Sequence, residues 1–220
     1  MTTEHTQQQL DYWQAQHKRR HPADPIIAAF ARPKLDFMLN YFDLPPAPLI
    51  LDVGCGNGYF TYYLQELGQT IGLDYAAAML AQNPVERLLQ ASALNLPYQD
   101  TLFDLSFCSN LLHHMDNPVA AIREMSRVSR RYIVISEPNR NNPAILALGL
   151  AKPAERDSLR FSAAYLQQLV EQAGLQILAC ETMGFVTPNR MPRPIANLVS
   201  PFNQPNPLGA YTVLIAQKPQ

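Results

Sequence analysis

Seven apolar runs recur along the chain, and amphipathic segments separate most of them. Each run has the length expected of a buried strand. The runs span 49–53, 70–74, 87–91, 103–110, 131–136, 175–182 and 211–216. Strands that alternate with helices are typical of an α/β fold with a mostly parallel sheet and helices on both faces, and the pattern predicts this fold.

The segments between these runs carry apolar residues at the spacing of one helix face. Pro33 is expected to break or kink the first predicted helix, and Asp116 or Asn117 is expected to cap the fourth. Ser162 is predicted to cap the last helix, and Gly174 to end it. The predicted helices span 25–42, 59–67, 76–82, 118–129, 143–151 and 163–173.

Three segments do not follow the alternation simply. Residues 1–9 are polar, are expected to be disordered, and lack the apolar core of a signal peptide. Residues 184–210 form a long proline-rich insertion, whose scattered apolar side chains favour a lid over a disordered link. The strand after this insertion is predicted to be antiparallel. The apolar helix at 143–151 fits core packing, an apolar substrate pocket, or peripheral contact with a membrane.

Composition narrows the class of protein and its partners. The chain has 220 residues and a hydrophobic content of 47%, which suits one domain with a real core. A net charge of −1 argues against a broad phosphate-binding surface, so nucleic acid is a disfavoured partner. Cys55, Cys108 and Cys180 are far apart, which indicates a reducing, cytoplasmic compartment and no metal site. No stretch reaches the roughly 18 apolar residues that span a bilayer.

The stretch that says most about function joins the first predicted strand to the next helix. It contains glycine at three alternate positions, Gly54, Gly56 and Gly58. A sharp turn from strand to helix gathers backbone N–H groups and the positive helix end at one point. Glycine permits positive φ and leaves no Cβ between main chain and ligand. The loop is therefore predicted to hold a small molecule, and the alternative is a turn that needs glycine for its shape alone.

The spacing of the glycines distinguishes between ligands. A dinucleotide fingerprint, G-x-G-x-x-G, would need glycine where Tyr59 stands. The pattern D-x-G-x-G-x-G that begins at Asp52 resembles the first motif of class I S-adenosylmethionine (SAM) methyltransferases. In that family the loop cradles the methionine end of SAM, and Asp52 is expected to act through ordered main chain or the methionine ammonium. The resemblance implies cofactor binding by Asp52, Gly54, Cys55 and Gly56.

Further cofactor residues follow the second and third predicted strands. Asp74 ends a strand, where a carboxylate can accept hydrogen bonds from the ribose hydroxyls of an adenosine ligand, SAM or NAD alike. Tyr75 is expected to pack on the ribose or the adenine. The pair Ser92-Ala93 resembles the family's third signature, with Ser92 in place of the usual Asp that bonds the adenine amino group. A hydroxyl there still accepts a hydrogen bond but brings no charge.

The fourth apolar run leads into Asn110-Leu111-Leu112-His113-His114, which resembles the family's fourth motif. The resemblance implies that main chain at Asn110 and Leu111 touches the methionine part of SAM. His113 or His114 is predicted as a general base, since imidazole titrates near neutrality, and a structural hydrogen-bonding role is the alternative for each. Because they are adjacent, the two histidines are not expected to chelate one metal as an i, i+4 helical pair would.

Two polar features are predicted on the acceptor side. Glu137 follows the fifth run at the carboxyl end of the sheet, where ligands bind in open α/β folds, so it is predicted as a substrate contact or a structural side chain. The basic cluster at 17–21 fits either a clamp for an acidic substrate or a solvated helix end.

The resemblance covers about residues 45–180 and is to the branch with ubiquinone and menaquinone biosynthesis methyltransferases. It implies a single domain over 1–220 with a Rossmann-like seven-stranded sheet of order 3-2-1-4-5-7-6. Within that domain 1–47 is expected to be an N-terminal helical lid, 48–183 and 211–217 the core sheet, and 184–210 the insertion.

The activity implied by the resemblance is methyl transfer from SAM to a small, apolar or lipid-like acceptor, with O- or C-methylation favoured. One alternative is methylation of RNA or protein. The chain lacks an Asn-Pro-Pro-Tyr or Asp-Pro-Pro-Tyr tetrad after the fourth run, which disfavours methylation of base amino groups. The other alternative is a SAM-binding module without transfer activity.

Overall fold

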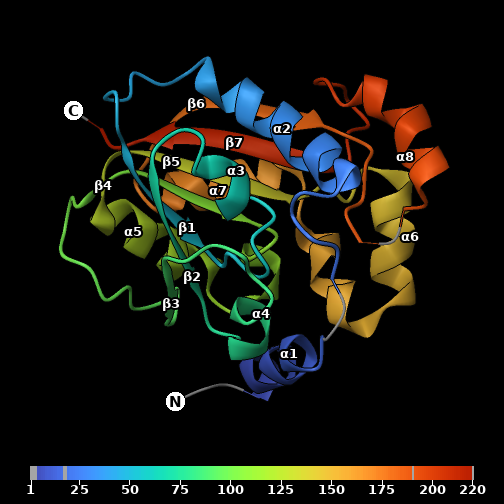
Figure 1. Cartoon of the computed structure of the whole chain (residues 1–220), viewed down its shortest axis with the longest axis horizontal. Coiled ribbons are helices and arrows are strands. Elements are labelled where there is room, and N and C mark those ends of the chain that lie inside the picture. Colours follow the sequence, from blue (N-terminus) through green and yellow to red (C-terminus); the bar gives the residue numbers. More distant parts are fainter. Residues whose placement is uncertain (1–3, 17–18, 190, 220) are drawn as a thin grey trace.

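A seven-stranded sheet is the centre of the computed structural model, which describes residues 4–16, 19–189 and 191–219. In chain order the strands are β1 (Leu49–Val53), β2 (Gln69–Asp74), β3 (Leu88–Gln90), β4 (Phe103–Ser109), β5 (Ser129–Pro138), β6 (Gln176–Met183) and β7 (Tyr211–Gln217). Their order in the sheet is β3-β2-β1-β4-β5-β7-β6 (Figure 1). β1 to β5 are parallel, whereas β7 is antiparallel to β5 and to β6. The fold class, strand order and antiparallel last strand predicted from the sequence are confirmed.

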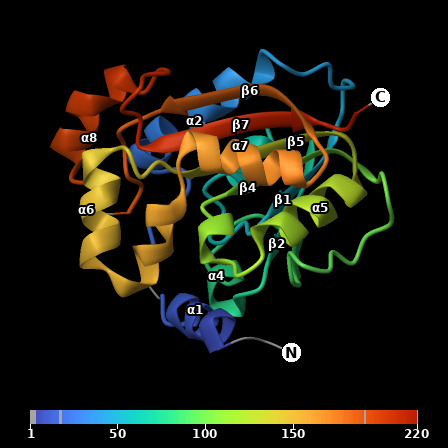
Figure 2. The same ribbon diagram turned by 180° about the vertical axis from the view of Figure 1, so that it is seen from behind.

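Helices cover both faces of the sheet. In chain order they are α1 (Glu4–Gln14), α2 (Pro25–Leu39), α3 (Thr61–Leu64), α4 (Ala77–Leu80), η1 (Leu112–His114), α5 (Pro118–Val128), α6 (Pro143–Ala151), η2 (Pro153–Arg160), α7 (Ala163–Gln172), α8 (Arg193–Val199) and η3 (Ser200–Phe202), where η denotes a 3-10 helix. Helices α2 and α3 lie on one face (Figure 1). Helices α5 and α7 lie on the other, as the view from behind shows (Figure 2).

Two apolar cores result from the alternation of side chains along the strands. On β5, Val134 belongs to the core beneath α2, while Ile133 and Ile135 belong to the core beneath α5 and α7. The antiparallel β7 alternates in the same way, with Ile215 on the first side and Leu214 on the second. Both β5 and β7 are therefore buried on both faces, which explains why their sequences are largely apolar.

Caps define several helix boundaries. Asn117 accepts a hydrogen bond from the N–H of Ala120 at 3.1 Å and begins α5, which decides between the two predicted caps. Ser162 accepts from the N–H of Tyr165 at 3.2 Å and begins α7, as predicted. Gly174 follows α7 with φ of 82°, the left-handed conformation that commonly ends a helix.

The N-terminal segment corrects one prediction. Residues 1–3 lie outside the described residues, but 4–9 belong to α1 and are not disordered. The helix is held by the body of the protein: the Gln14 side-chain carbonyl accepts from the N–H of Ala78 at 3.1 Å, beside α4 (Figure 1). Tertiary contacts of this kind can stabilise a helix even where the sequence of the segment does not clearly predict one.

The insertion at 184–210 contains α8 and η3, and its role as a lid stays a prediction. The insertion also explains why Pro33 does not break α2, which continues to Leu39. Proline has no N–H to donate to the carbonyl four residues earlier, here Ala29. The buried side chain of Asn203 supplies that donor, with Nδ2 2.7 Å from the Ala29 oxygen, while its Oδ1 accepts from the N–H of Phe185 at 2.9 Å.

Helix α6 forms as predicted and buries only part of its apolar surface. Ile145 is buried, whereas Leu146 and Leu150 are 45% and 65% exposed. None of the helices among the described residues is both long and apolar enough to cross a membrane. Peripheral membrane contact through α6 stays a prediction.

Replacing Asn203 by alanine tests the link between the insertion and α2. The change leaves a buried carbonyl at Ala29 and a buried N–H at Phe185 without this partner, so we expect the free energy of unfolding to fall by about 1–3 kcal/mol. Urea denaturation measures the loss. Asn197→Ala, at an exposed position on α8, is the matched control and should change stability by less than about 0.5 kcal/mol. Equal effects of the two changes would contradict the assignment.

Candidate functional site

The glycine loop after β1 lies at the carboxyl edge of the parallel strands. Gly54, Gly56 and Gly58 have φ of 72°, 52° and 89°, a region that residues with side chains adopt only at a cost. The N–H groups of Gly54 and Cys55 both donate to the carbonyl of Leu73 in β2, at 2.7 and 2.9 Å. The loop is thus fastened to the neighbouring strand.

Close packing also excludes side chains from the glycine positions. A Cβ at Gly58 would lie 2.4 Å from Oδ1 of Asn83, and one at Gly54 would lie 2.8 Å from Cδ1 of Leu111. Asn83 in turn donates from Nδ2 to the Gly56 carbonyl at 3.1 Å. Part of the glycine pattern therefore serves the shape of the loop, which was the alternative interpretation of the sequence.

Asp74 ends β2 and organises the same loop. Its two carboxylate oxygens accept from the N–H groups of Gly56 and Ala76, each at 2.8 Å. Burial raises the pKa of Asp74, and the backbone donors act in the opposite direction. A carboxylate has about four acceptor positions, so two N–H donors leave capacity for further donors such as ribose hydroxyls.

Asp52 is buried at the start of the loop, and its carboxylate accepts a hydrogen bond from within the protein. Its Oδ2 accepts from the hydroxyl of Thr61, the first residue of α3, at 2.6 Å. Burial raises the pKa of Asp52 to about 7, the Thr61 hydrogen bond opposes this, and the charge of Asp74 adds to it. The contact with Thr61 places Asp52 where it orders main chain, one of the two roles expected for it.

The other predicted cofactor residues border the same edge. Tyr75 directly follows β2 and its side chain is 45% exposed. Ser92 and Ala93 follow β3, and the Ser92 hydroxyl accepts from the N–H of Leu94 at 3.2 Å. Cys55 is buried, with Sγ 3.7 Å from Asn83 Nδ2.

The loop after β4 adjoins the glycine loop. Asn110 has φ of 53°, uncommon for a residue with a side chain, and its N–H donates to the carbonyl of Ser136 in β5 at 2.9 Å. The side chain of Leu111 fills the space above Gly54. The two loops predicted to contact the methionine end of SAM are therefore in contact with each other.

Glu137 holds the β4 loop, and the structure argues against the predicted substrate contact. The side chain is fully buried in β5. Its Oε1 accepts from the N–H groups of Leu111 and Leu112, each at 2.9 Å, and its Oε2 lies 2.6 Å from Nδ1 of His113. An acceptor molecule cannot reach a carboxylate enclosed in this way, so Glu137 positions the loop and the histidine.

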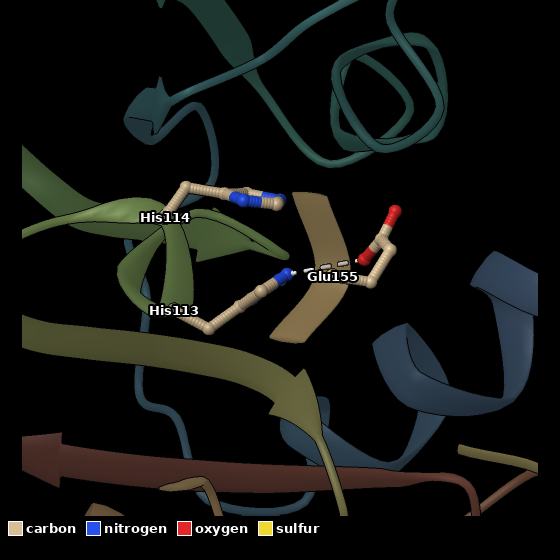
Figure 3. A group of neighbouring side chains, drawn as sticks. All are labelled: His113, His114 and Glu155. Atoms are coloured by element: carbon tan, nitrogen blue, oxygen red, sulfur yellow. Dashed lines mark ion pairs between the residues drawn. The ribbon is translucent and has the colours of Figure 1, made fainter. Parts of the chain in front are cut away.

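The two predicted histidines lie beside a carboxylate that sequence analysis missed. Nε2 of His113 is 3.7 Å from Oε2 of Glu155 in η2, and the two imidazole rings are 3.8 Å apart between centroids (Figure 3). Burial lowers the pKa of His113, but the carboxylates of Glu137 and Glu155 raise it to a net value of about 9. No spacing in the sequence links Glu155 to the histidines, because η2 meets η1 only in the folded protein.

The atoms of this cluster that could bind a metal are close together, although the two histidines are adjacent in the sequence. One nitrogen of His113, one of His114 and one carboxylate oxygen of Glu155 all lie within 4.8 Å of one another. The histidines are on a 3-10 turn with rings tilted by 44°, so neighbouring positions in the sequence do not direct these rings apart.

Segments from both ends of the chain lie against the site. Trp13 of α1 makes an edge contact with His114, with ring centroids 5.1 Å apart. Arg20 donates to the carbonyl of Met191 at 2.9 Å, and its own carbonyl accepts from Asn57 in the glycine loop at 3.1 Å. Of the basic cluster at 17–21, residues 17 and 18 lie outside the described residues. The N-terminal segment and the insertion thus meet each other beside the loop.

Comparison with known proteins identifies part of the chain. Residues 51–132 match the family model of the methyltransferase domain. The chain is similar to malonyl-[acyl-carrier protein] O-methyltransferase from Pectobacterium atrosepticum, at 33% identity over 86 residues, which are 37% of this chain and 34% of the relative. It is also similar to tRNA U34 carboxymethyltransferase from Campylobacter hominis, at 29% over 102 residues, 42% of this chain and 35% of the relative. It spans about a third of the length of each.

Solved structures share the whole architecture. A SAM-dependent methyltransferase from Thermotoga maritima superposes with a TM-score of 0.69 over 88% of this chain and 92% of its own. The sequence identity of 20% means that this likeness shows the fold alone.

Replacing Asp52 by asparagine tests the buried acid. A carboxyl whose pKa is raised in the folded state stabilises the protein at pH values below the unfolded pKa, and that contribution is lost as pH rises through about 7. Asparagine keeps an acceptor for Thr61 and does not ionise. We therefore expect the variant to gain roughly 2–3 kcal/mol relative to the wild type between pH 5 and pH 8.

Urea denaturation at the two pH values gives this difference. Asp36→Asn, at an exposed position on α2, is the control and should show no comparable gain. A difference between Asp52→Asn and wild type that does not vary with pH would contradict the raised pKa.

Proposed function

We propose that the chain, which matches the methyltransferase domain over residues 51–132, is a class I SAM-dependent methyltransferase that transfers a methyl group to a small, apolar or lipid-like acceptor. O- or C-methylation is favoured. The observation that carries the proposal is the glycine loop held by Asp74 at the ends of β1 and β2. The domain match covers this loop and β2, and it ends in β5.

The residues of the loop fit SAM. Gly56 has positive φ at the turn, and it leaves main chain exposed to a ligand without a Cβ. Asp74 keeps acceptor capacity for the ribose hydroxyls, and Tyr75, Ser92 and Ala93 border the adenine side at the ends of β2 and β3. Bound SAM supplies a methyl group that is already activated on a sulfonium, so the protein mainly orients the reactants and excludes water.

Asn110 and Leu111 would adjoin the methionine end, beside Gly54. Asp52 would support this end by holding Thr61 at the start of α3. In this proposal Asp52 positions the main chain and does not contact the methionine ammonium directly.

His113 and His114 are the proposed catalytic region, with different roles. His113 is 2% exposed and enclosed by Glu137 and Glu155, so an acceptor does not reach it. His114 is half-buried and touches Trp13 by an edge contact, and its greater exposure makes it the histidine that an acceptor can touch. His113 then acts as a positioning residue through its contact with the ring of His114.

The closing segments favour a small acceptor. Helix α1 is bonded to α4, and Arg20 joins the glycine loop to the insertion, which leaves little room for a macromolecule to lie flat on this edge. The net charge of −1 also provides no broad basic surface for RNA. A tRNA-modifying relative makes RNA the second acceptor class to test.

The acceptor class is tested by incubating the protein with methyl-labelled SAM and separate pools of quinones, phenols, lipids, acyl-carrier-linked acids and RNA. Label in a small molecule or lipid supports the proposal. Label in RNA alone would replace it by the second candidate. SAM binding without transfer to any pool would favour a binding module.

Asp74→Ala tests the cofactor site. The change removes the acceptor for the ribose hydroxyls and releases Gly56 from its anchor, and charge-assisted hydrogen bonds are worth about 1.5–3 kcal/mol each, so we expect SAM to bind at least about tenfold more weakly. Asp74→Asn keeps one acceptor oxygen and should lose less SAM affinity than Asp74→Ala.

Calorimetry measures the dissociation constant, and circular dichroism checks that the variants fold. The exposed change Asp36→Ala should leave SAM affinity within about twofold. An unchanged dissociation constant for Asp74→Ala would remove Asp74 from the cofactor site.

A further inference from the structure

The cluster of His113, His114 and Glu155 has a geometry that the methyltransferase role does not require. It joins two elements far apart in the sequence, η1 and η2 (Figure 3). One potential ligand atom from each residue lies within 4.8 Å of the others. Oε2 of Glu155 lies 3.7 Å from Nε2 of His113. This distance is too long for a hydrogen bond.

Glu137 sets the orientation of the His113 ring, on the side away from the cluster. Glu137 is surrounded by N–H donors of the β4 loop and accepts from Nδ1 of His113 at 2.6 Å. A metal ion would displace the proton from Nε2, and with Nδ1 still protonated toward Glu137 this nitrogen then presents a lone pair. This nitrogen is buried and makes no hydrogen bond to the residues that the structure describes. A carboxylate that fixes one ring nitrogen while the other faces a ligand cluster is the arrangement found behind metal-binding histidines.

The charges in this region also favour a cation. Glu137 is fully buried and the Glu155 side chain is 20% exposed. Within the described part of the chain, both carboxylates pair with His113, and neither forms an ion pair with lysine or arginine. A buried carboxylate is costly unless a positive charge or hydrogen-bond donors accompany it. Glu137 already has such donors in the β4 loop, and an ion at the cluster would add a positive charge beside Glu155.

We propose that His113, His114 and Glu155 bind one divalent transition-metal ion of the zinc class, with a fourth position open. Two imidazoles and one carboxylate are a ligand set that suits Zn²⁺, and three protein ligands with an open position are typical of catalytic zinc. Tetrahedral zinc with bonds of about 2.0–2.1 Å holds its ligand atoms about 3.3 Å apart. The observed separations, which are at most 4.8 Å, would have to close by about 1.5 Å or less, within the reach of side-chain rotation.

One consequence of the metal site rests on the proposed methyl transfer. The cluster follows Leu111, whose side chain covers Gly54, so the ion would lie on the acceptor side of the glycine loop. There it would bind an acceptor through oxygen and promote loss of the hydroxyl proton to solvent. The oxygen lone pair then forms the bond to the methyl carbon, and the electron pair of the broken C–S bond stays on sulfur. Oxygen acids such as phenols or hydroxy acids fit this site.

Metal binding is tested on the full chain without a histidine tag, after removal of metal with a chelator. Titration of Zn²⁺ against a chromophoric chelator should show one ion per chain. Glu155→Gln removes a charged ligand at a partly exposed position, and we expect at least about tenfold weaker binding. Glu137→Gln keeps the shape behind His113 but weakens its orientation, with an expected loss of about 10–100-fold. Glu171→Gln, exposed on α7, is the matched control and should bind as wild type.

Cobalt(II) provides a spectroscopic check, because a four-coordinate site gives intense visible bands that Glu155→Gln should reduce. Absence of stoichiometric zinc binding, or equal affinity in Glu155→Gln, Glu171→Gln and wild type, would overturn the inference. SAM affinity is measured by calorimetry on the same samples. If the wild type binds SAM but not zinc, the metal site alone is overturned. If it binds zinc but not SAM, the metal site is supported and the proposed function is overturned.

Discussion

The glycine loop depends on the end of β2. Three successive donors, the N–H groups of Gly54, Cys55 and Gly56, are taken up there, two by the Leu73 carbonyl and one by the Asp74 carboxylate. A loop of residues with positive φ has few conformations that suit it and many that do not, so ordering it costs conformational entropy. The bonds to β2 offset this cost and hold the loop in one shape. The same carboxylate that would bind the ribose therefore also builds the surface beside it.

The loop after β4 is ordered in the same way, by a carboxylate from the neighbouring strand β5. Glu137, near the end of β5, accepts from two N–H groups of the loop after the neighbouring strand and from His113. Asp74 and Glu137 thus each hold the loop of the adjacent strand, β1 and β4, and these two strands are themselves paired. The loops meet where Leu111 covers Gly54. Two acidic residues, one from each strand that flanks the central pair β1 and β4, therefore fix the two loops at the carboxyl ends of that pair.

The sequence predicted the features that neighbouring residues determine. The apolar runs and the glycine spacing indicated the strands and the loop, and the family resemblance supplied the order of the sheet, which the structure confirms. Contacts between distant residues gave no such signal. Glu155 reaches His113 because η2 packs on η1, and Asn203 completes α2 at the carbonyl that Pro33 leaves without its helical donor. Residues 4–9 were expected to be disordered because their sequence is polar, yet they belong to α1, which packs against α4.

This division follows the two halves of the proposed reaction. The cofactor side is built from consecutive segments, β1 to β4, that fold against one another through short connections. The acceptor side brings together α1, η2 and the insertion before β7, which are remote in the chain. Trp13 of α1 contacts His114 and Glu155 of η2 lies beside His113, so changes in these two elements alter the surface around the histidines without removing the main-chain bonds of Asp74 or Glu137. The fold can therefore keep one donor site while its acceptor changes, and the relatives are named for acceptors as different as malonyl-[acyl-carrier protein] and tRNA.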